Sequence, residues 1–290
     1  VYKRQVRTLR EGSPDALIHL SHDVSGSALD EGELQSLGVF IDFEQGGYGD
    51  FSHVDRHLNV IRWLVEGERR VDWLVNLTGQ DFPVMPVSEI EQELADSDAD
   101  ALLEVRPVYG PDAPWPRSRV HSRYYFHHKR LMPLSPRSKR VLRGLQVINR
   151  LQPHVRVHVS HGLVVGRPAP APFGPDFRLH GGSAFMSLRW SAVEYLHAYA
   201  EANPEVLEYF RWTISPVEAT FATILANAPE LRLENDCKRY FDFSQSTFGH
   251  PKTLGVDDLA QARASGAHFA RKFSADDDLV YEALREMVSG

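Results

Sequence analysis

The sequence predicts an α/β fold, built as a three-layer sandwich around a mostly parallel central sheet. Between residues 16 and 105, short apolar runs alternate with segments of helical periodicity, as when crossover helices join parallel strands. The composition supports a folded protein with an ample core, since 42% of the 290 residues are hydrophobic and 24% are charged. No internal repeat or low-complexity tract divides the chain, and we therefore expect a single domain over residues 1–290.

Each expected element follows from a local pattern. The apolar residues of 54–65 recur at helical spacing, whereas 73–77 is a short apolar run bounded by polar residues, as in a strand buried on both faces. Four prolines between residues 168 and 175 predict a stiff loop. The expected strands are residues 16–20, 38–43, 73–77, 101–105 and 183–188. The expected helices are residues 5–9, 54–65, 87–94, 139–151, 193–199, 213–228 and most of 256–287.

The net charge and the number of cysteines limit which classes of partner and which cellular compartment the sequence favours. The net charge of −7 does not favour a nucleic-acid partner. The single cysteine, Cys237, excludes an internal disulfide framework and a cysteine-rich zinc site. No apolar run approaches the roughly 18 to 20 residues of a membrane span, and no signal peptide is recognisable. We expect a cytoplasmic protein, with association at a membrane surface left open.

The beginning of the sequence is unusual. It starts at Val1 without methionine, and the helix-like residues 5–9 follow with no strand before them. This order predicts a fragment that lacks the first strand of its fold.

Residues 213–228 contain the carboxylate of greatest interest, Glu218. Ser215 is a good N-cap, Pro216 suits the first helical position, and Glu218 stands three residues after Ser215, which is the spacing of a capping box. The simplest interpretation is therefore a carboxylate that closes the end of a helix. The alternative is a general base that the start of a helix holds rigidly in place.

The sequence offers no clear metal site. His53 and His57 are four residues apart without the intervening glutamate of a zinc protease, so a polar helix face explains them better. Asp96, Asp98 and Asp100 form two D-x-D pairs, but they precede a strand and are typical of a solvated turn.

Nucleotide binding has no standard signature either. The sequence contains neither a P-loop nor the glycine fingerprint of a dinucleotide fold. Lys252 and Lys272 are cations able to neutralise a leaving diphosphate, and ordinary surface lysines are the alternative interpretation.

Five segments in a fixed order resemble glycosyltransferase family 14, the core-2/I-branching β-1,6-N-acetylglucosaminyltransferases and the related peptide O-xylosyltransferases. They are residues 76–83 (NLTGQDFP), 182–185 (GSAF), 215–218 (SPVE), 239–242 (RYFD) and 269–273 (FARKF). The resemblance runs from about residue 5 to residue 284. It implies a GT-A fold, a UDP-sugar donor, inversion at the anomeric carbon and no D-x-D metal, and hence no cofactor besides the UDP-sugar co-substrate.

The resemblance also implies roles for individual residues. The catalytic base of the family falls on Glu218, and the lysine that binds the donor diphosphate falls on Lys272. Lys252 is the nearest match for a second cation, and acceptor contacts fall on Glu104 and Tyr240. Val217 replaces the usual aspartate of the S-P-D-E motif, which leaves the base in place.

The expected function is therefore an inverting, metal-independent transferase that moves a sugar from UDP to an acceptor hydroxyl. N-acetylglucosamine is the first expectation for that sugar and xylose the alternative. The acceptor is expected to be a glycan, a peptide or a small molecule. A rival class is a glycan- or nucleotide-binding protein with this fold and no turnover. The single cysteine and the lack of a membrane anchor suggest a soluble, bacterial-type relative.

Overall fold

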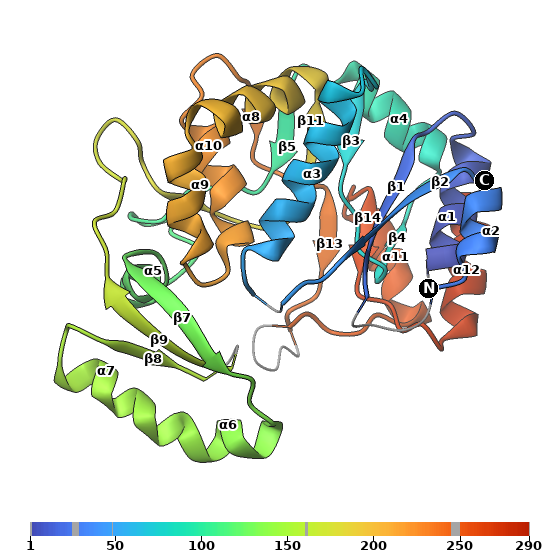
Figure 1. Ribbon diagram of the computed structural model, residues 1–290. Coiled ribbons are helices and arrows are strands. Elements are labelled where there is room, and N and C mark those ends of the chain that lie inside the picture. Colours follow the sequence, from blue (N-terminus) through green and yellow to red (C-terminus); the bar gives the residue numbers. More distant parts are fainter. Residues whose placement is uncertain (1, 25–28, 48, 160–161, 245–249, 290) are drawn as a thin grey trace.

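The computed structural model describes residues 2–24, 29–47, 49–159, 162–244 and 250–289, in which strands and helices alternate (Figure 1). The strands are β1 Ile18–Asp23, β2 Val39–Glu44, β3 Trp73–Val75, β4 Asp81–Pro83, β5 Ala101–Leu103, β6 Arg106–Pro107, β7 Phe126–Met132, β8 Arg156–His158, β9 Leu163–Pro168, β10 His180–Gly181, β11 Met186–Arg189, β12 Leu233–Glu234, β13 Arg239–Phe241 and β14 Phe269–Arg271. The α-helices are α1 Tyr2–Gly12, α2 Glu31–Ser36, α3 Ser52–Glu66, α4 Val87–Asp96, α5 Arg117–Tyr124, α6 Pro136–Leu142, α7 Ile148–Leu151, α8 Trp190–Ala202, α9 Pro204–Arg211, α10 Thr220–Ala226, α11 Leu259–Ala264 and α12 Asp278–Val288. The 3₁₀ helices are η1 Arg143–Val147, η2 Pro216–Glu218 and η3 Val256–Asp258.

A four-stranded sheet of order β12-β5-β11-β3 has helices on both faces. Ala101 and Leu103 of β5 join the apolar cluster that contains α3, α8 and α10, whereas Leu102 joins the cluster of α4. Successive side chains of a strand point to opposite faces, so these two clusters are the two outer layers of a sandwich. The predicted α/β fold class is confirmed.

The central sheet is mixed in direction. β11 runs antiparallel between β3 and β5, and β12 is parallel to β5. β3 and β5 are therefore parallel to each other, with β11 inserted between them.

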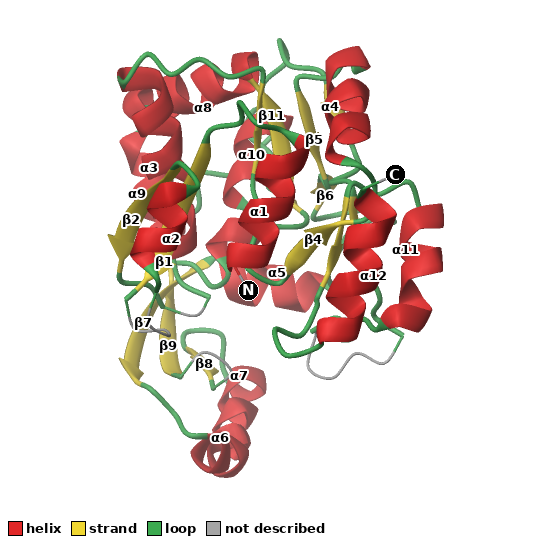
Figure 2. Ribbon diagram, turned by 90° about the vertical axis from the view of Figure 1, so that its right-hand side faces the viewer, coloured by secondary structure: helices red, strands yellow, loops and turns green. Residues whose placement is uncertain are grey.

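A three-stranded sheet of order β13-β14-β4 adjoins the α11 and α12 helices (Figure 2). β14 is parallel to β13 and antiparallel to β4, so that Ala270 pairs with both Tyr240 and Phe82. This sheet brings residues near 80, 240 and 270 side by side.

The segment from β7 to β9 forms a small subdomain that protrudes from the main body (Figure 1). Its sheet has the order β7-β9-β8, and α6, η1 and α7 follow its outer edge. The basic helix expected over residues 139–151 is thus present, but as three short helical pieces.

The C-terminal third departs from the expected elements in two places. The expected helix over residues 213–228 is divided into η2 and α10, and the mainly helical tail contains the strand β14. The strand is only three residues long, too short for its periodicity to stand out between two helices. Within the described ranges, no helix is long and apolar enough to cross a membrane.

Candidate active site

Glu218 lies at the end of η2, directly before a break that separates this turn from α10. Ser215 adopts the left-handed backbone region at φ 53° and ψ 52°, and its side chain makes no capping hydrogen bond. Its N–H donates to the carbonyl of Gly49 at 3.1 Å, and the Tyr124 hydroxyl donates to its carbonyl at 3.2 Å. The expected capping box is therefore wrong, because this backbone conformation directs Ser215 away from an N-cap.

The Glu218 carboxylate is held by Arg123 of α5. Nη1 of Arg123 donates to Oε2 of Glu218 at 2.6 Å, and the Glu218 side chain is 35% exposed. Burial disfavours the charged guanidinium of Arg123, but the neighbouring Tyr124 and Glu218 outweigh burial and raise its pKa. Arg123 is thus a permanent cation that fixes one carboxylate oxygen. Among the described residues, Oε1 of Glu218 has no hydrogen-bond or ion-pair partner.

Two glycines allow Glu104 and Trp115 to approach Glu218. The N–H of Gly182 donates to the Glu218 carbonyl at 2.9 Å, and a Cβ at Gly182 would meet the Glu104 carbonyl oxygen at 1.8 Å. A Cβ at Gly181 would meet the Trp115 ring at 2.3 Å. Any side chain at either position would push these neighbours apart.

Trp115 and Arg106 complete this group of side chains. The Arg123 guanidinium lies over the Trp115 ring, 5.3 Å from its centroid. Glu104 forms an ion pair with Arg106 at 3.0 Å. The backbone carbonyls of Glu104 and Glu218 thus both lie against Gly182, and each of the two carboxylates pairs with an arginine.

Asn76 connects this neighbourhood to other segments of the family resemblance. Its amide nitrogen donates to the Ala184 carbonyl at 2.9 Å, and its Oδ1 accepts from the N–H of Met186 at 2.7 Å. Its carbonyl accepts from Nη2 of Arg239 at 3.0 Å. These bonds, the β13-β14-β4 sheet and the bond from Gly182 to the Glu218 carbonyl together connect all five segments of the resemblance.

Lys272 follows β14, at the other end of this network. The N–H of Phe273 donates to the Gln80 carbonyl at 3.0 Å, so Lys272 lies against the 76–83 turn. In the part of the chain that the structure describes, no carboxylate forms an ion pair with Lys272. Its charge is available for an anion.

A buried charge group supports the turn beside Lys272. Arg271 pairs with the fully buried side chain of Asp81 at 3.4 Å, and burial raises the pKa of Asp81. Burial lowers the pKa of Arg239, which contributes to the same group, to about 10. Buried charges of opposite sign are costly to separate, so this group fixes β4, β13 and β14 to one another.

Lys252 lies near Lys272, but its charge is already used. Its Nζ pairs with Asp258 at 2.7 Å and lies 3.9 Å from Asp242. The hydrogen bond to Asp258 raises the pKa of Lys252. Since the N–H of Leu254 donates to the Lys272 carbonyl at 2.9 Å, the two lysines share one region.

Tyr240 is placed on the side of Lys252. It packs against the apolar cluster of Phe82 and Leu254, and burial, together with Asp242 and Asp258, raises its pKa. The neighbouring Phe241 faces the opposite way, toward the Phe185 ring at 5.8 Å. The structure does not bring Tyr240 together with Glu104 and Glu218.

His57 and Asp100 have structural partners. Nδ1 of His57 donates to the His53 carbonyl at 2.6 Å, its Nε2 accepts from Asn76 at 2.9 Å, and burial lowers its pKa. Asp100 accepts from the Ser191 hydroxyl and from the N–H of Arg232 at 2.9 Å. Among described residues, no three His, Cys, Asp or Glu side chains converge as ligands of a metal ion.

Sequence reasoning missed Arg123 and Trp115. Arg123 is 95 residues from Glu218 in the sequence, and no local spacing connects them. The abundance of Arg and aromatic residues over 115–130 was the available signal, but it does not say which of them reaches the carboxylate.

Comparison with known proteins identifies the family of the chain. The sequence model of the core-2/I-branching enzymes matches residues 36–265, which is most of the chain. The chain belongs to the core-2/I-branching enzyme family. The matched range contains Glu104, Glu218, Tyr240 and Lys252, whereas Lys272 lies just beyond it.

Two Arabidopsis thaliana proteins of this family resemble the chain. Beta-glucuronosyltransferase GlcAT14A is 32% identical over 116 residues, which are 39% of this chain and 26% of that protein. Beta-glucuronosyltransferase GlcAT14B is 22% identical over 289 residues, which are 96% of this chain and 58% of that protein. The chain therefore spans only part of the length of both relatives.

Proposed function

We propose that this chain is an inverting glycosyltransferase that transfers a sugar from a UDP-sugar to an acceptor hydroxyl. The proposal rests mainly on Glu218, a half-exposed carboxylate with one oxygen fixed by Arg123 and the other open. Family membership supports the class of reaction. Glu104 and Trp115 beside Glu218 are suited to hold an acceptor.

In the proposed reaction, an acceptor hydroxyl gives its proton to Oε1 of Glu218 while its oxygen attacks the anomeric carbon of the donor. The bond from that carbon to the UDP oxygen breaks, and UDP leaves with the electron pair. Lys272 stabilises the negative charge that grows on the diphosphate. Lys252 contributes only if its pairing with Asp258 is exchanged for phosphate.

We propose that no divalent metal is needed for this reaction. The support is the unpaired charge of Lys272 on the proposed donor side, together with the structural roles of Asp100 and His57. Chelation tests this directly: transfer should persist in EDTA. Loss of transfer in EDTA and recovery with Mn²⁺ would contradict it.

The donor sugar has three candidates. The family resemblance of the sequence favours N-acetylglucosamine and allows xylose, whereas the two similar plant proteins are named as glucuronosyltransferases. UDP release should be measured with each of the three UDP-sugars, with and without acceptor. Acceptor-stimulated release with one donor supports the proposal, and UDP binding without release from any donor would favour the binding-protein alternative.

We further infer that the protruding subdomain binds the surface of a membrane that contains anionic lipid. Its edge exposes a group of apolar side chains, here called the apolar patch. The patch consists of Leu131, Met132, Val141, Leu145, Val147, Ile148 and Leu151. These are seven of the sixteen large apolar side chains that are exposed among described residues, within a stretch of 21 residues. Such clustering marks an interaction surface, since scattered exposed apolar residues are normal.

Charge indicates what covers the apolar patch. Residues 113–175 contain 12 Lys and Arg and no Asp or Glu, although the whole chain has a net charge of −7. A cationic helical surface with exposed aliphatic side chains is typical of proteins that lie on anionic bilayers. Figures 1 and 2 show α6 and α7 at the outer edge of the molecule, where a flat surface can reach them.

A further inference from the structure

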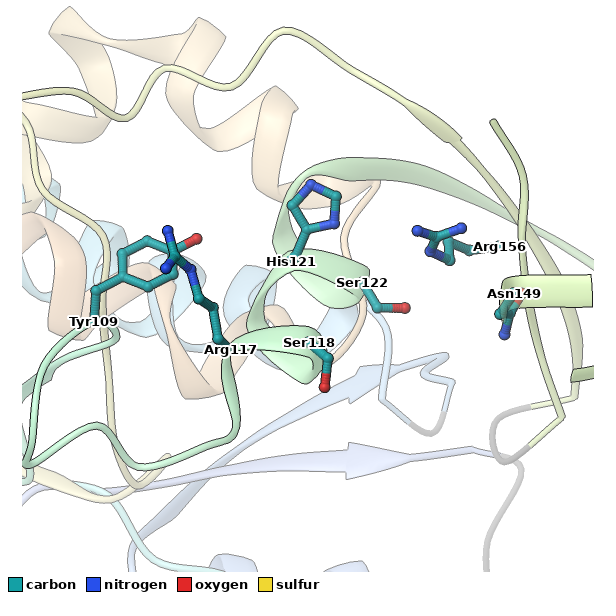
Figure 3. A pocket seen from close by; sticks show the side chains of 7 residues that line it. All are labelled: Tyr109, Arg117, Ser118, His121, Ser122, Asn149 and Arg156. Carbon is teal, nitrogen blue, oxygen red and sulfur yellow. The ribbon is translucent and has the colours of Figure 1, made fainter. Parts of the chain in front are cut away.

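A pocket of about 570 Å³ lies between α5 and the protruding subdomain (Figure 3). One side is formed by α5, from which Arg117, Ser118, His121 and Ser122 line the pocket. The remaining lining residues are Tyr109, Asn149 from α7 and Arg156 from β8. Neither Lys252 nor Lys272 lines this pocket.

The lining of this pocket is cationic. Two guanidinium groups and one imidazole line it together with neutral hydrogen-bonding groups, and no carboxylate does. The surrounding residues 113–175 lack any Asp or Glu, whereas the rest of the chain has 20 Lys and Arg against 39 Asp and Glu. In an acidic protein, this concentration of positive charge favours an anionic ligand.

Both arginines are held in position without using up their charge. The Arg117 guanidinium lies over the Tyr109 ring, 5.4 Å from its centroid. Arg156 lies over the Phe126 ring at 4.7 Å, and its Nη1 donates to the carbonyls of Gln152 and Val155. Across the described ranges, neither arginine forms an ion pair with a carboxylate. Stacked and unpaired guanidinium groups are suited to bind carboxylate, sulfate or phosphate in a bidentate manner.

The neutral residues form a fixed frame around these cations. The side-chain amide of Asn149 is held in place, since it donates to and accepts from the backbone of Val157 at 2.8 and 2.7 Å. The Ser122 hydroxyl bonds to Nε2 of His158 at 3.0 Å. Figure 3 shows Arg117 and Arg156 toward opposite ends of the pocket, with His121 between them.

The pocket is connected to the candidate active site through α5. Arg117 and His121 are four residues apart and share one side of this helix, whereas Arg123, which holds Glu218, projects from a different side. A helix of this length measures about 12 Å, and its diameter with side chains is about 10 to 12 Å. An anionic group in the pocket and a hydroxyl at Glu218 are thus separated by a distance on the order of 10 Å.

We propose that this pocket is an acceptor subsite for an oxyanion, a carboxylate, sulfate or phosphate, on a unit of the acceptor other than the one that receives the sugar. The inference rests on the proposed transferase function. It adds that the acceptor is an acidic oligomer, bound through Arg117 and Arg156. A neutral acceptor of equal length would form no charge-assisted contact with these two arginines.

Binding in the absence of donor tests the subsite independently of turnover. The probes are a trisaccharide with one uronic acid, its carboxyl-reduced neutral analogue and a sulfated analogue, each titrated calorimetrically into the full chain. We expect the two acidic probes to bind at least tenfold more tightly than the neutral one. Their order identifies which oxyanion is preferred.

Paired variants locate the binding. Arg117→Gln with Arg156→Gln should weaken the acidic probes about tenfold or more and leave UDP affinity unchanged. Arg137→Gln with Arg140→Gln removes the same charge from exposed positions of α6 and should change neither. Arg117→Lys with Arg156→Lys keeps the charge but loses the planar fork, and should give an intermediate loss.

Three outcomes would overturn the subsite. The first is equal affinity of the wild type for acidic and neutral probes. The second is a loss of acidic-probe affinity in the α6 control as large as in the pocket variant. The third is competition between UDP and the acidic probe for the pocket arginines. Thermal melting of each variant distinguishes a lost contact from a lost fold. If the probes bind as expected but no UDP-sugar is turned over, the proposed transferase function fails while the anion site stands.

Discussion

The relation between Glu218 and Arg123 determines how the proposed base works. A carboxylate fixed through one oxygen keeps a defined orientation and can still accept a proton on the other oxygen. Sequence spacing identified Glu218 but gave it a capping partner, Ser215, that the left-handed backbone rules out. The true partner comes from α5, and only the folded chain reveals it.

Glu218→Gln should reduce transfer by roughly 10²-fold or more while UDP affinity stays nearly constant. The amide retains the shape of the side chain and can still accept from Arg123 through its oxygen, but it cannot take up the hydroxyl proton. Initial rates and UDP titrations on the same preparations measure the two effects. Near-normal transfer by this variant would show that Glu218 is not the base.

Lys272→Ala should weaken UDP binding by about one to two decades, because a charge-assisted bond to phosphate contributes roughly 1.5 to 3 kcal/mol. Lys252→Ala is the matched comparison. This substitution removes an equal charge nearby, but from a lysine that is already paired with Asp258. We expect the smaller loss for Lys252. UDP affinity is measured by calorimetry. A larger loss of affinity in Lys252→Ala than in Lys272→Ala would mean that Lys252, and not Lys272, binds the diphosphate.

At the scale of elements, the sequence predicted the long periodic helices and the apolar strands well. α3, α4 and α8 and the strands β1, β2, β3 and β5 were all foreseen, because each has a clear period or an uninterrupted apolar run. The sequence missed the helices α2, α5 and α9 and the strands β7 and β9, and the C-terminal elements that it altered or missed, η2 and β14, are short. η2 is a single turn and β14 has three residues, and the surrounding tertiary bonds, not their own periodicity, determine their conformation.

β7 offers a test of how the protruding subdomain is attached. Its His128 donates from Nε2 to the Ser122 carbonyl at 3.0 Å, and the His128 N–H donates to the Trp212 carbonyl at 2.6 Å. Burial, followed by the charge of nearby His158, lowers the pKa of His128 to about 3. The ring is therefore neutral in the folded protein at all ordinary pH values.

Stability should consequently fall as the pH drops below about 6.5, the ordinary pKa of an unfolded histidine. The unfolded chain binds a proton at His128 first, and the folded chain does so only near pH 3. The slope from this residue approaches about 1.4 kcal/mol per pH unit. Urea unfolding between about pH 7 and 5 should show a shallower slope for His128→Gln than for the wild type. The exposed His154→Gln is the control, and equal slopes for wild type and His128→Gln would contradict the assignment.

At the scale of the molecule, the five segments of the resemblance were predicted to be related, and the fold supplies the reason. Asn76, Gly182 and Arg239 join them through hydrogen bonds to backbone carbonyls, and two of these bonds connect residues more than one hundred positions apart. Order and spacing along the sequence sufficed to recognise the family. They did not suffice to place Tyr240 on the far side of β13 or to pair Lys252 with Asp258, because both depend on which face of a strand meets which loop.

The uneven distribution of charge and exposed apolar residues leads to a prediction for the whole protein. The chain should sediment with vesicles that contain phosphatidylglycerol or phosphatidylserine, and not with vesicles of phosphatidylcholine alone. Each basic side chain near an anionic surface contributes about 1 kcal/mol, and each inserted aliphatic side chain about 1.5 to 3 kcal/mol. Val141→Ser with Leu151→Ser should therefore weaken binding by about 10²-fold, since these side chains are 80% and 77% exposed at the edge of the subdomain.

Leu279→Ser is the control, because Leu279 is 71% exposed on α12 and outside the apolar patch. Added salt should weaken binding of the wild type, as screening of the basic residues requires. Equal sedimentation of the patch variant and the wild type would overturn the membrane assignment. So would a dimer in vesicle-free solution that the patch variant abolishes, since a second copy of the chain would then cover the patch.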